Sequence, residues 1–233
     1  MTYVMSDIHG HYQKYLTMLD KIGFSDDDTL YVLGDVLDRG EQPAELLWDM
    51  SLRANVIPLL GNHELTAAVL LRRLCVEITG DNAETQITQE LLGAIYDWQE
   101  DGGDTTLSGF RRLAQEDRCA LLDYIDDFLP YETLTVAGNR FLLVHGGIPY
   151  DGRHLPPDAH SLITLTESRP DYHRRYFDDV YLVTGHTPTL HIDPAYTGRI
   201  FRGHGHIAVD CGAGFGMPLG CIRLDDFKEF YVY

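Results

Sequence analysis

Three short apolar runs near the start of the chain each end in a cluster of polar residues. The runs cover residues 3–5, 29–33 and 56–60, and they are followed by SDIHG, GDVLDRG and GNHE. Short apolar runs bounded by glycine and polar residues are typical of buried strands. Asp35 follows Asp7 by 28 positions and Asn62 follows Asp35 by 27, which fits a strand, a helix and the next strand. The pattern predicts consecutive βαβ units whose polar turns meet at one edge of a sheet.

Helical periodicity separates these runs. Tyr12, Leu16, Leu19 and Ile22 predict a helix over 11–22, ended by Gly23. Further helices are expected over 43–54, where a proline suits the first turn, and over 65–76. Residues 77–130 predict helices at 88–99, 108–114 and 116–128, and between them lies the stretch 98–107, which has two glycines and an acidic flank. We expect this block to be a helical insertion that caps one end of the sheet, within a single domain of residues 1–233.

The second half of the chain is typical of β structure. Residues 131–137 and 140–146 flank Gly138-Asn139, a two-residue hairpin signal. Strands are also expected at 180–184, 205–210, 219–224 and 227–233, with a partly helical stretch over 161–176. Two of these strands again end in histidine, at His145 and His186. The mixture of βαβ units and hairpins places the chain in the α+β class.

Composition excludes some classes of partner. The chain has 18 Lys and Arg against 36 Asp and Glu, a formal net charge of −18, whereas nucleic acids are bound through Lys and Arg. No apolar run reaches the roughly eighteen residues of a membrane span, and residues 1–10 lack the basic segment of a signal peptide. We therefore expect a cytoplasmic protein with no nucleic-acid or membrane partner. Its four cysteines, Cys75, Cys119, Cys211 and Cys221, are expected to be reduced thiols.

The polar residues after the expected strands form a mixed set of carboxylates, imidazoles and an amide. They are Asp7, His9, Asp35, Asp38, Asn62, His63, His145 and His186. Such ligands suit divalent first-row metals, manganese first, with iron or zinc as alternatives. A shared carboxylate can hold two ions roughly 3.5–4 Å apart, the geometry that clamps both oxygens of an in-line displacement. Asp35 is the expected bridge because it lies centrally in the series.

Five motifs occur in order between Asp7 and Thr187: D-x-H-G, G-D-x-x-D-R-G, G-N-H-E, H-G-G and G-H-T. At these spacings they resemble the calcineurin-like metallophosphoesterases, and most closely the bacterial and phage serine/threonine phosphoprotein phosphatases. The resemblance implies a four-layer α/β/β/α sandwich of two mixed sheets with helices outside. It also implies two metal sites that share Asp35, the first formed by Asp7, His9 and Asp35 and the second by Asp35, Asn62, His145 and His186.

The same resemblance assigns catalytic and substrate-binding roles. His63 is the implied general acid for the leaving group, Asp38 orients it, and Arg39 binds phosphate oxygens. Arg169, in the sequence SRP, is the candidate for a second phosphate-binding arginine, although the tryptophan that usually precedes it is absent. Ser6 stands where the family usually has glycine. The expected substrate is a phosphorylated protein or peptide, and the oligomeric state is not predicted.

Two other functions stay open. Hydrolases of dinucleoside polyphosphates such as diadenosine tetraphosphate resemble the chain closely, including a helical cap with a tryptophan and a Gly-Gly pair like Trp98 and Gly102-Gly103. They commonly lack the aspartate at the position of Asp38 and carry GNHD instead of GNHE, which favours the phosphatase. The third hypothesis is a non-catalytic metal-binding scaffold, and the intact His63–Asp38 pair argues against it.

Several of these residues also have purely structural explanations. The motif histidines can be hydrogen-bonded core residues, Arg39 can simply pair with Asp38, and Arg169 can be an ordinary surface residue. Outside the motifs, surface or loop positions are expected for His11, His191, His204 and His206. Glu41, Asp101 and Asp104 are expected to form a solvated acidic rim, with a role in substrate recognition as the alternative that no motif supports.

Overall fold

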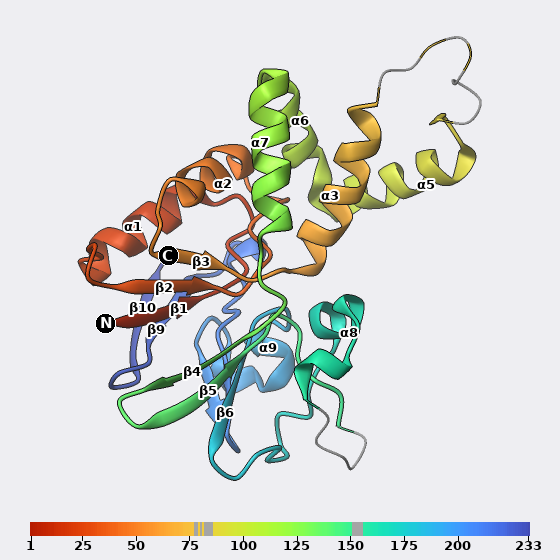
Figure 1. Ribbon diagram of the computed structural model, residues 1–233. Helices are drawn as coiled ribbons and strands as arrows, with labels where there is room; N and C mark the ends of the chain where they lie inside the picture. Colours follow the sequence, from red (N-terminus) through yellow and green to blue (C-terminus); the bar gives the residue numbers. More distant parts are fainter. Residues whose placement is uncertain (77–78, 80, 82–85, 151–155) are drawn as a thin grey trace.

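Two mixed five-stranded sheets pack face to face in the computed structural model, which describes residues 1–76, 79, 81, 86–150 and 156–233 (Figure 1). The strand orders are β10-β9-β1-β2-β3 and β4-β5-β6-β8-β7. The first sheet contains β1 (Thr2–Met5), β2 (Thr29–Val32), β3 (Val56–Pro58), β9 (Leu219–Arg223) and β10 (Lys228–Val232). The second contains β4 (Glu132–Val136), β5 (Asn139–Leu143), β6 (Val180–Thr184), β7 (Phe201–Gly203) and β8 (His206–Ala208).

The expected βαβ units are confirmed. Strands β1, β2 and β3 are adjacent and parallel, and α1 (Tyr12–Ile22) and α2 (Pro43–Ser51) connect them. Helix α3 (Asn62–Leu74) begins at Asn62, so the expected start at residue 65 is wrong. The reason is a cap: Glu64, in the first turn, accepts the N–H of Gly61 at 3.1 Å. The turns after β1, β2 and β3 therefore lie at one edge of the sheet.

Successive side chains along each strand point to opposite faces of the sheet, so each sheet packs against the other sheet on one face and against helices on the other. Val4, Phe141 and Leu143 belong to the apolar cluster that lies between the sheets. Their neighbours point the other way: Met5 packs with the helices on the first sheet, and Leu142 packs in the cluster that includes Leu165 of α8. Helices α8 (Leu162–Glu167) and α9 (Thr189–Ile192) lie on the second sheet's side of the molecule (Figure 1). The expected double-sheet sandwich flanked by helices is confirmed.

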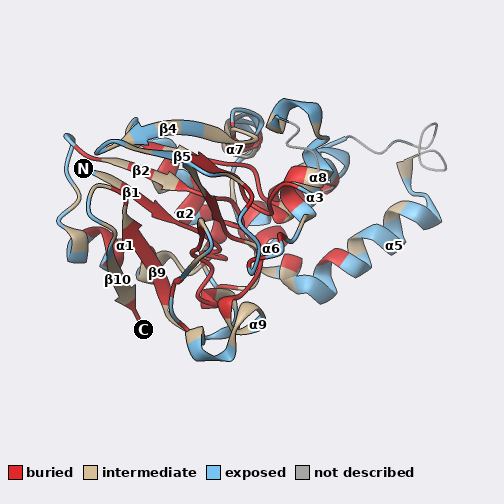
Figure 2. Ribbon diagram, turned by 90° about the horizontal axis from the view of Figure 1, so that it is seen from below, coloured by how far each residue is buried: buried red, intermediate tan, exposed pale blue. Residues whose placement is uncertain are grey.

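The expected helical block is present in its described part. It consists of α5 (Gln89–Trp98), α6 (Asp104–Arg112) and α7 (Gln115–Asp126), while residues 77–78, 80 and 82–85 lie outside the described residues. The stretch 98–107 between the expected helices is mostly helical: residues 99–103 form a π-helical turn, kinked at Gly102 with a φ of 99°, that leads into α6. Figure 2 shows buried residues concentrated along the strands and α5 exposed over most of its length. That residues 1–233 form a single domain stays a prediction.

Two expectations for the second half need correction. The β4–β5 turn is Ala137-Gly138, because Val136 pairs with Asn139; both turn residues have positive φ, 47° and 82°. His206 was expected at the surface, but it is buried at the start of β8, with Nε2 2.8 Å from the Arg174 carbonyl oxygen. Neither β7 nor α9 was expected from the sequence. All four cysteines are free thiols, as expected.

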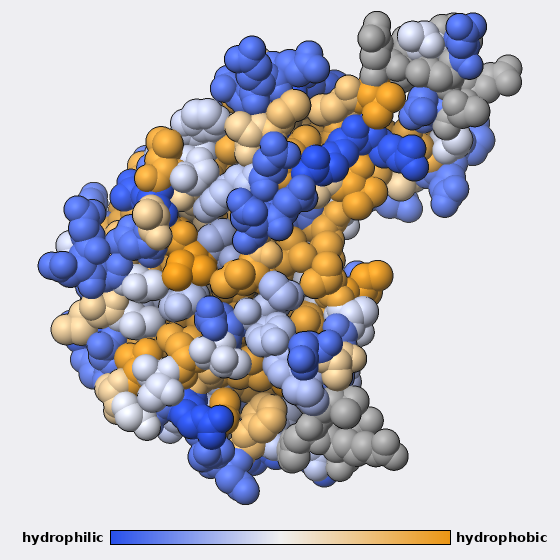
Figure 3. Space-filling view, in the orientation of Figure 1, coloured by the Kyte–Doolittle hydropathy of each residue, from blue (hydrophilic) through white to orange (hydrophobic). Residues whose placement is uncertain are grey.

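The surface combines polar and apolar areas. Between α3 and α8 it is hollowed and apolar side chains gather there (Figure 3), with Leu65, Val69 and Leu162 lining the groove. Among the described residues, every helix is too short or too polar to cross a bilayer.

Candidate active site

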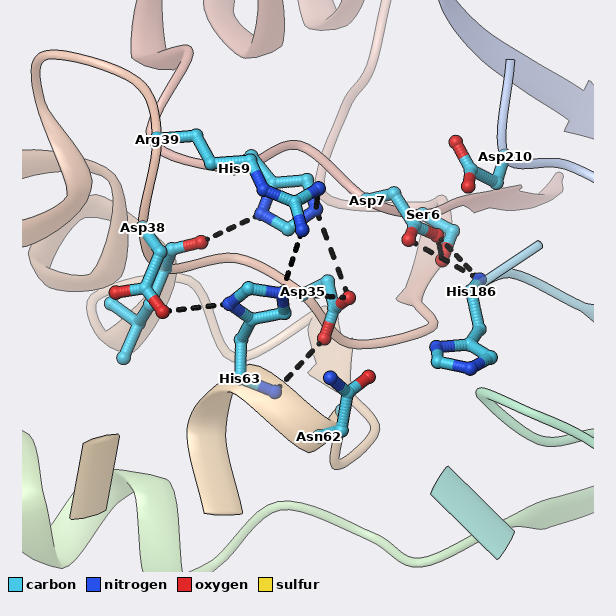
Figure 4. Close-up of polar contacts among 12 residues, drawn as sticks. Ser6, Asp7, His9, Asp35, Asp38, Arg39, Asn62, His63, His186 and Asp210 are labelled. Carbon is cyan, nitrogen blue, oxygen red and sulfur yellow. Dashed lines mark hydrogen bonds and ion pairs between the residues drawn. The ribbon is translucent and has the colours of Figure 1, made fainter. Parts of the chain in front are cut away.

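Strand ends from both sheets converge on one polar cluster. In the first sheet, Asp7 follows β1, Asp35 follows β2 and Asn62 follows β3. In the second, His145 follows β5 and His186 follows β6. Figure 4 shows side chains from the first sheet's turns facing His186 across this cluster. Potential ligand atoms of Asp35, His145 and His186 lie within 4.8 Å of one another, as do those of His9, Asp35 and His63. Four of the six predicted metal ligands, His9, Asp35, His145 and His186, are thus neighbours in space.

Hydrogen bonds orient two of the histidines for metal binding. Nδ1 of His9 lies 2.9 Å from the Leu37 carbonyl oxygen, and Nδ1 of His145 bonds the Leu33 carbonyl. Since a carbonyl only accepts, each Nδ1 carries a proton. Each Nε2 then points toward Asp35, at 3.7 Å for His9 and 3.3 Å for His145. A backbone carbonyl on one ring nitrogen is the usual second partner of a metal-ligating histidine.

Electrostatics of the cluster suit bound cations. Burial raises the pKa of Asp7 to about 6 and lowers the pKa of His9 to about 3 and of His186 to about 4. Burial also acts to raise the pKa of Asp35, but His145 and His63 beside it hold that pKa well below its usual range. Burial acts to lower the pKa of His145 as well, but Asp35 raises it to about 10. Buried carboxylates beside imidazoles form a donor set that fits divalent metal ions.

Other predicted ligands complete the arrangement. Asn62 Oδ1 lies 3.0 Å from Nε2 of His145. Asp7 Oδ2 accepts the backbone N–H of His186 at 3.0 Å, which ties the two sheets together at the site. The Ser6 hydroxyl donates to the Leu33 carbonyl at 3.0 Å, so the residue that replaces the usual glycine fits this turn.

Backbone strain concentrates at the same place. Positive φ values between 46° and 68° occur at Asp7, His9, Asp35, Asp38, Arg39 and His186. Such conformations are costly for residues with side chains and persist where the surroundings fix them. Strained turns therefore present these side chains to the cluster.

Glu64 fixes the strained turn at Asp35. The side chain is fully buried. Oε2 accepts the backbone N–H of Asp35 at 2.8 Å, and Oε1 accepts those of Val36 at 2.8 Å and Leu37 at 3.0 Å. The GNHE motif contains this residue, but sequence reasoning gave it no role, because its partners lie 27 to 29 positions away.

His63 and Asp38 form the expected pair. His63 Nδ1 lies 2.7 Å from Oδ2 of Asp38. Burial acts to lower the pKa of His63, but Asp35 and Asp38 raise it to about 9. These two carboxylates favour the protonated imidazole, which donates Nδ1–H to Asp38 and has Nε2 on the cleft side.

Two residues of the helical block hold Asp38 in turn, and both were missed as site residues. Trp98 Nε1 donates to Oδ2 of Asp38 at 2.9 Å, and the Thr106 hydroxyl donates to Oδ1 at 2.5 Å. A side chain on Gly103 would collide with the Trp98 ring at 2.4 Å, so glycine is required for this packing. Trp98 is part of the resemblance to dinucleoside polyphosphate hydrolases, whereas Thr106 carries no sequence signal.

Arg39 does not pair with Asp38, which contradicts the structural alternative for this residue. Its Nη2 donates to Oδ1 of Asp101 at 3.0 Å and its guanidinium lies over the Phe215 ring, 4.6 Å from the centroid. Nη2 is also 3.1 Å from Nε2 of His63. Asp101 is thus more than part of a solvated rim, although its side chain is 60% exposed.

The cluster opens into a cleft of about 750 Å³. Arg169 lines this cleft, is exposed and makes no hydrogen bond or ion pair with the described residues; its charge contributes to the lowered pKa of His186. Asp210 also lines the cleft, is buried, and accepts the N–H of Gly212 at 2.8 Å. Sequence reasoning missed Asp210 because it extended the strand through residue 210. A carboxylate at the end of an apolar run, just before a glycine, is the signal that could have found it.

Relatives identified by sequence are named as symmetrical bis(5'-nucleosyl)-tetraphosphatases. A bis(5'-nucleosyl)-tetraphosphatase, symmetrical, from Paracidovorax citrulli is 33% identical over 152 residues, covering 63% of this chain and 44% of that protein. One from Aromatoleum aromaticum is 26% identical over 285 residues, covering 99% of this chain and 96% of that protein. The match to the first of these relatives thus spans less than half of its length.

Solved structures share the fold, and a family model matches most of the chain. A putative diadenosine tetraphosphatase has a TM-score of 0.65 at 14% identity, covering 99% of this chain and 92% of that chain. A protein serine/threonine phosphatase from Saccharomyces cerevisiae has a TM-score of 0.56 at 16% identity, covering 99% and 78%. These likenesses show the fold alone. The model described as calcineurin-like phosphoesterase matches residues 2–208, and on that match the chain belongs to the calcineurin-like phosphoesterase family.

Proposed function

We propose that this protein is a dimetal hydrolase that cleaves dinucleoside tetraphosphates symmetrically. The observation that carries the proposal is the contact of the helical block with the site, where Trp98 bonds Asp38 and Gly102 bonds the backbone of Arg39. A cap with a tryptophan and a Gly-Gly pair is the feature by which the chain resembles dinucleoside polyphosphate hydrolases. The names of the relatives found by sequence support this substrate over the phosphoprotein that the motifs first suggested.

The cleft has the chemistry that a polyphosphate needs. Arg39 and Arg169 both line it, and a charge-assisted hydrogen bond from each contributes roughly 1.5–3 kcal/mol. The Phe215 ring lines the same cleft and is 61% exposed, which leaves ring surface for stacking on a nucleobase. The formal charge of −18 opposes a polyanion, so the two arginines and bound cations have to supply the attraction.

The metal-binding residues in this proposal are Asp7, His9, Asp35, Asn62, His145 and His186. Two divalent ions, which we propose to be manganese, would supply activation of a water molecule and neutralisation of phosphoryl oxygens. Arg39 presents its two parallel donors to those oxygens. As the water oxygen bonds to phosphorus and the bridging P–O bond breaks, His63 gives its Nε2 proton to the leaving oxygen, and Asp38 keeps the ring oriented.

Relative turnover of two substrates tests the proposal. With manganese added, kcat/KM is measured for diadenosine tetraphosphate and for a phosphoserine peptide. We expect the dinucleotide to be the better substrate. Turnover of the peptide alone would contradict the proposed substrate and favour the second candidate below.

Hydrolysis of phosphomonoesters on protein serine or threonine is the second candidate. The 2.7 Å contact between His63 and Asp38 favours it, because a serine alkoxide needs a proton to leave whereas a nucleoside diphosphate needs little help. In the His63→Asn variant we expect turnover of phenyl phosphate to fall about 10²–10⁴-fold, with a much smaller loss for p-nitrophenyl phosphate. Equal losses for the two esters would show that His63 is not the acid.

A further inference from the structure

A carboxylate from the helical block reaches the two groups proposed to act on the reacting phosphate. Asp101 Oδ1 accepts from Arg39 Nη2 at 3.0 Å, and Asp101 Oδ2 lies 3.5 Å from Nε2 of His63. The Asp101 side chain is 60% exposed, while that of His63 is only 4% exposed. The carboxylate therefore approaches these two nitrogens from the solvent side of the cleft.

The π-helical turn fixes the backbone of Asp101. The carbonyl of Gly102 accepts the backbone N–H of Arg39 at 3.0 Å, and a side chain on Gly102 would lie 2.6 Å from Arg39 Cγ. On the other side of Asp101, Trp98 is anchored to Asp38. Because the backbone is held on both sides, the contact between Asp101 and Arg39 breaks by rotation of the side chains and not by movement of the turn.

A carboxylate and a phosphate offer the guanidinium the same kind of acceptor oxygens, so they compete for it. We propose that Asp101 is a specificity-determining residue that selects against substrates carrying two negative charges on the reacting phosphate. The inference rests on the proposed phosphate-binding role of Arg39. Repulsion between Asp101 and the phosphate grows with the phosphate charge. A terminal phosphomonoester is a dianion, whereas each internal phosphate of a dinucleoside tetraphosphate carries one charge, so Asp101 favours the internal bond.

The test removes this charge without changing the side-chain shape. In Asp101→Asn, binding of inorganic phosphate is measured by calorimetry, and kcat/KM is measured for p-nitrophenyl phosphate, a dianion, and bis-p-nitrophenyl phosphate, a monoanion. Glu100→Gln is the matched control, because Glu100 is exposed on the same turn and loses the same charge. We expect about three- to fivefold tighter phosphate binding, the range of an exposed ion pair. The ratio of monoester to diester turnover should rise by a similar factor.

Each result has a distinct meaning. Phosphate binding and a monoester-to-diester ratio like those of the parent and the Glu100→Gln control would overturn the inference. Weaker binding would overturn it as well, because Asp101 would then be orienting Arg39 for phosphate. If the parent binds phosphate but does not cleave diadenosine tetraphosphate, the proposed substrate fails while the phosphate measurement still decides the role of Asp101. A parent that neither binds phosphate nor cleaves any of these esters would contradict both.

Discussion

Asp35 is the most constrained side chain of the site. Its carboxylate faces Nε2 of His145 at 3.3 Å and Nε2 of His9 at 3.7 Å, and its backbone N–H is held by Glu64. Both imidazoles are oriented so that their second nitrogen faces this carboxylate. A carboxylate in that position is suited to be shared by two cations, one for each ligand group.

We expect the Asp35→Asn variant to bind one metal equivalent or none and to lose activity. The asparagine amide is neutral, so both ions lose the negative charge that the Asp35 carboxylate places beside them. Metal analysis after dialysis, together with turnover of p-nitrophenyl phosphate, measures the effect. Asp104→Asn, an exposed site in the helical block, is the control. Two retained equivalents with full activity would show that Asp35 is not shared.

The residues of the site differ in whether they can be identified from the sequence alone. Asp7, Asp35 and His145 could be found because each is a polar residue directly after an apolar strand. The ends of neighbouring parallel strands meet at one edge of a sheet, where a site is expected. Thr106 could not, because its partner Asp38 is 68 positions away and no periodicity links them. The Arg39–Asp101 contact was missed for a similar reason, since it depends on how the helical block folds back over the sheet.

At the scale of elements, the helical block contributes side chains to the candidate site. The end of α5 supplies Trp98, the π-helical turn supplies Asp101, and α6 supplies Thr106. The sequence predicts helices here and places the stretch 98–107, with its two adjacent glycines, between them. The glycines are required by close packing on Arg39 and Trp98.

Trp98→Phe tests the contribution of this block. The change keeps an aromatic ring against Gly103 and removes the N–H donated to Asp38. A hydrogen bond to a charged group contributes roughly 1.5–3 kcal/mol, so we expect about a tenfold or larger fall in phenyl phosphate turnover with the metal content unchanged. Trp48→Phe on α2, where the tryptophan is 39% exposed, is the control. A loss of metal in Trp98→Phe would show a general structural role instead.

Strand β8 begins with a buried titratable residue outside the cluster. His206 packs between the rings of Tyr172 and Tyr176, and burial lowers its pKa. The unfolded chain therefore takes up a proton at the ordinary histidine pKa, about 6.5, while the folded protein does not. The free energy of unfolding should consequently decrease as the pH falls below that value.

Urea unfolding of the parent and of His206→Phe between pH 7.5 and 5 measures this effect. Phenylalanine keeps the ring packing and cannot be protonated, so the variant should lose less stability over this range. The difference between the two slopes, and not the absolute stability, is the informative quantity. Parallel loss of stability in both proteins would contradict the assignment.

For the whole molecule, the decisive feature is that both sheets deliver their strand ends to one cleft. The order and direction of β1, β2 and β3 could be predicted from the spacing of three motifs. The packing of the second sheet on the first followed from the resemblance, since contacts such as His186 to Asp7 join residues 179 positions apart. Strand β7, only three residues long and containing a charged arginine, carries too weak a pattern to predict.

Product analysis tests the central proposal most directly. The protein is incubated with diadenosine tetraphosphate and manganese, and the nucleotides are separated by anion-exchange chromatography. A dimetal site that cleaves the central phosphoanhydride bond yields ADP as the sole product, two molecules for each substrate consumed. Formation of AMP and ATP in equal amounts, or no consumption of the dinucleotide by a preparation that hydrolyses phosphomonoesters, would contradict the proposal.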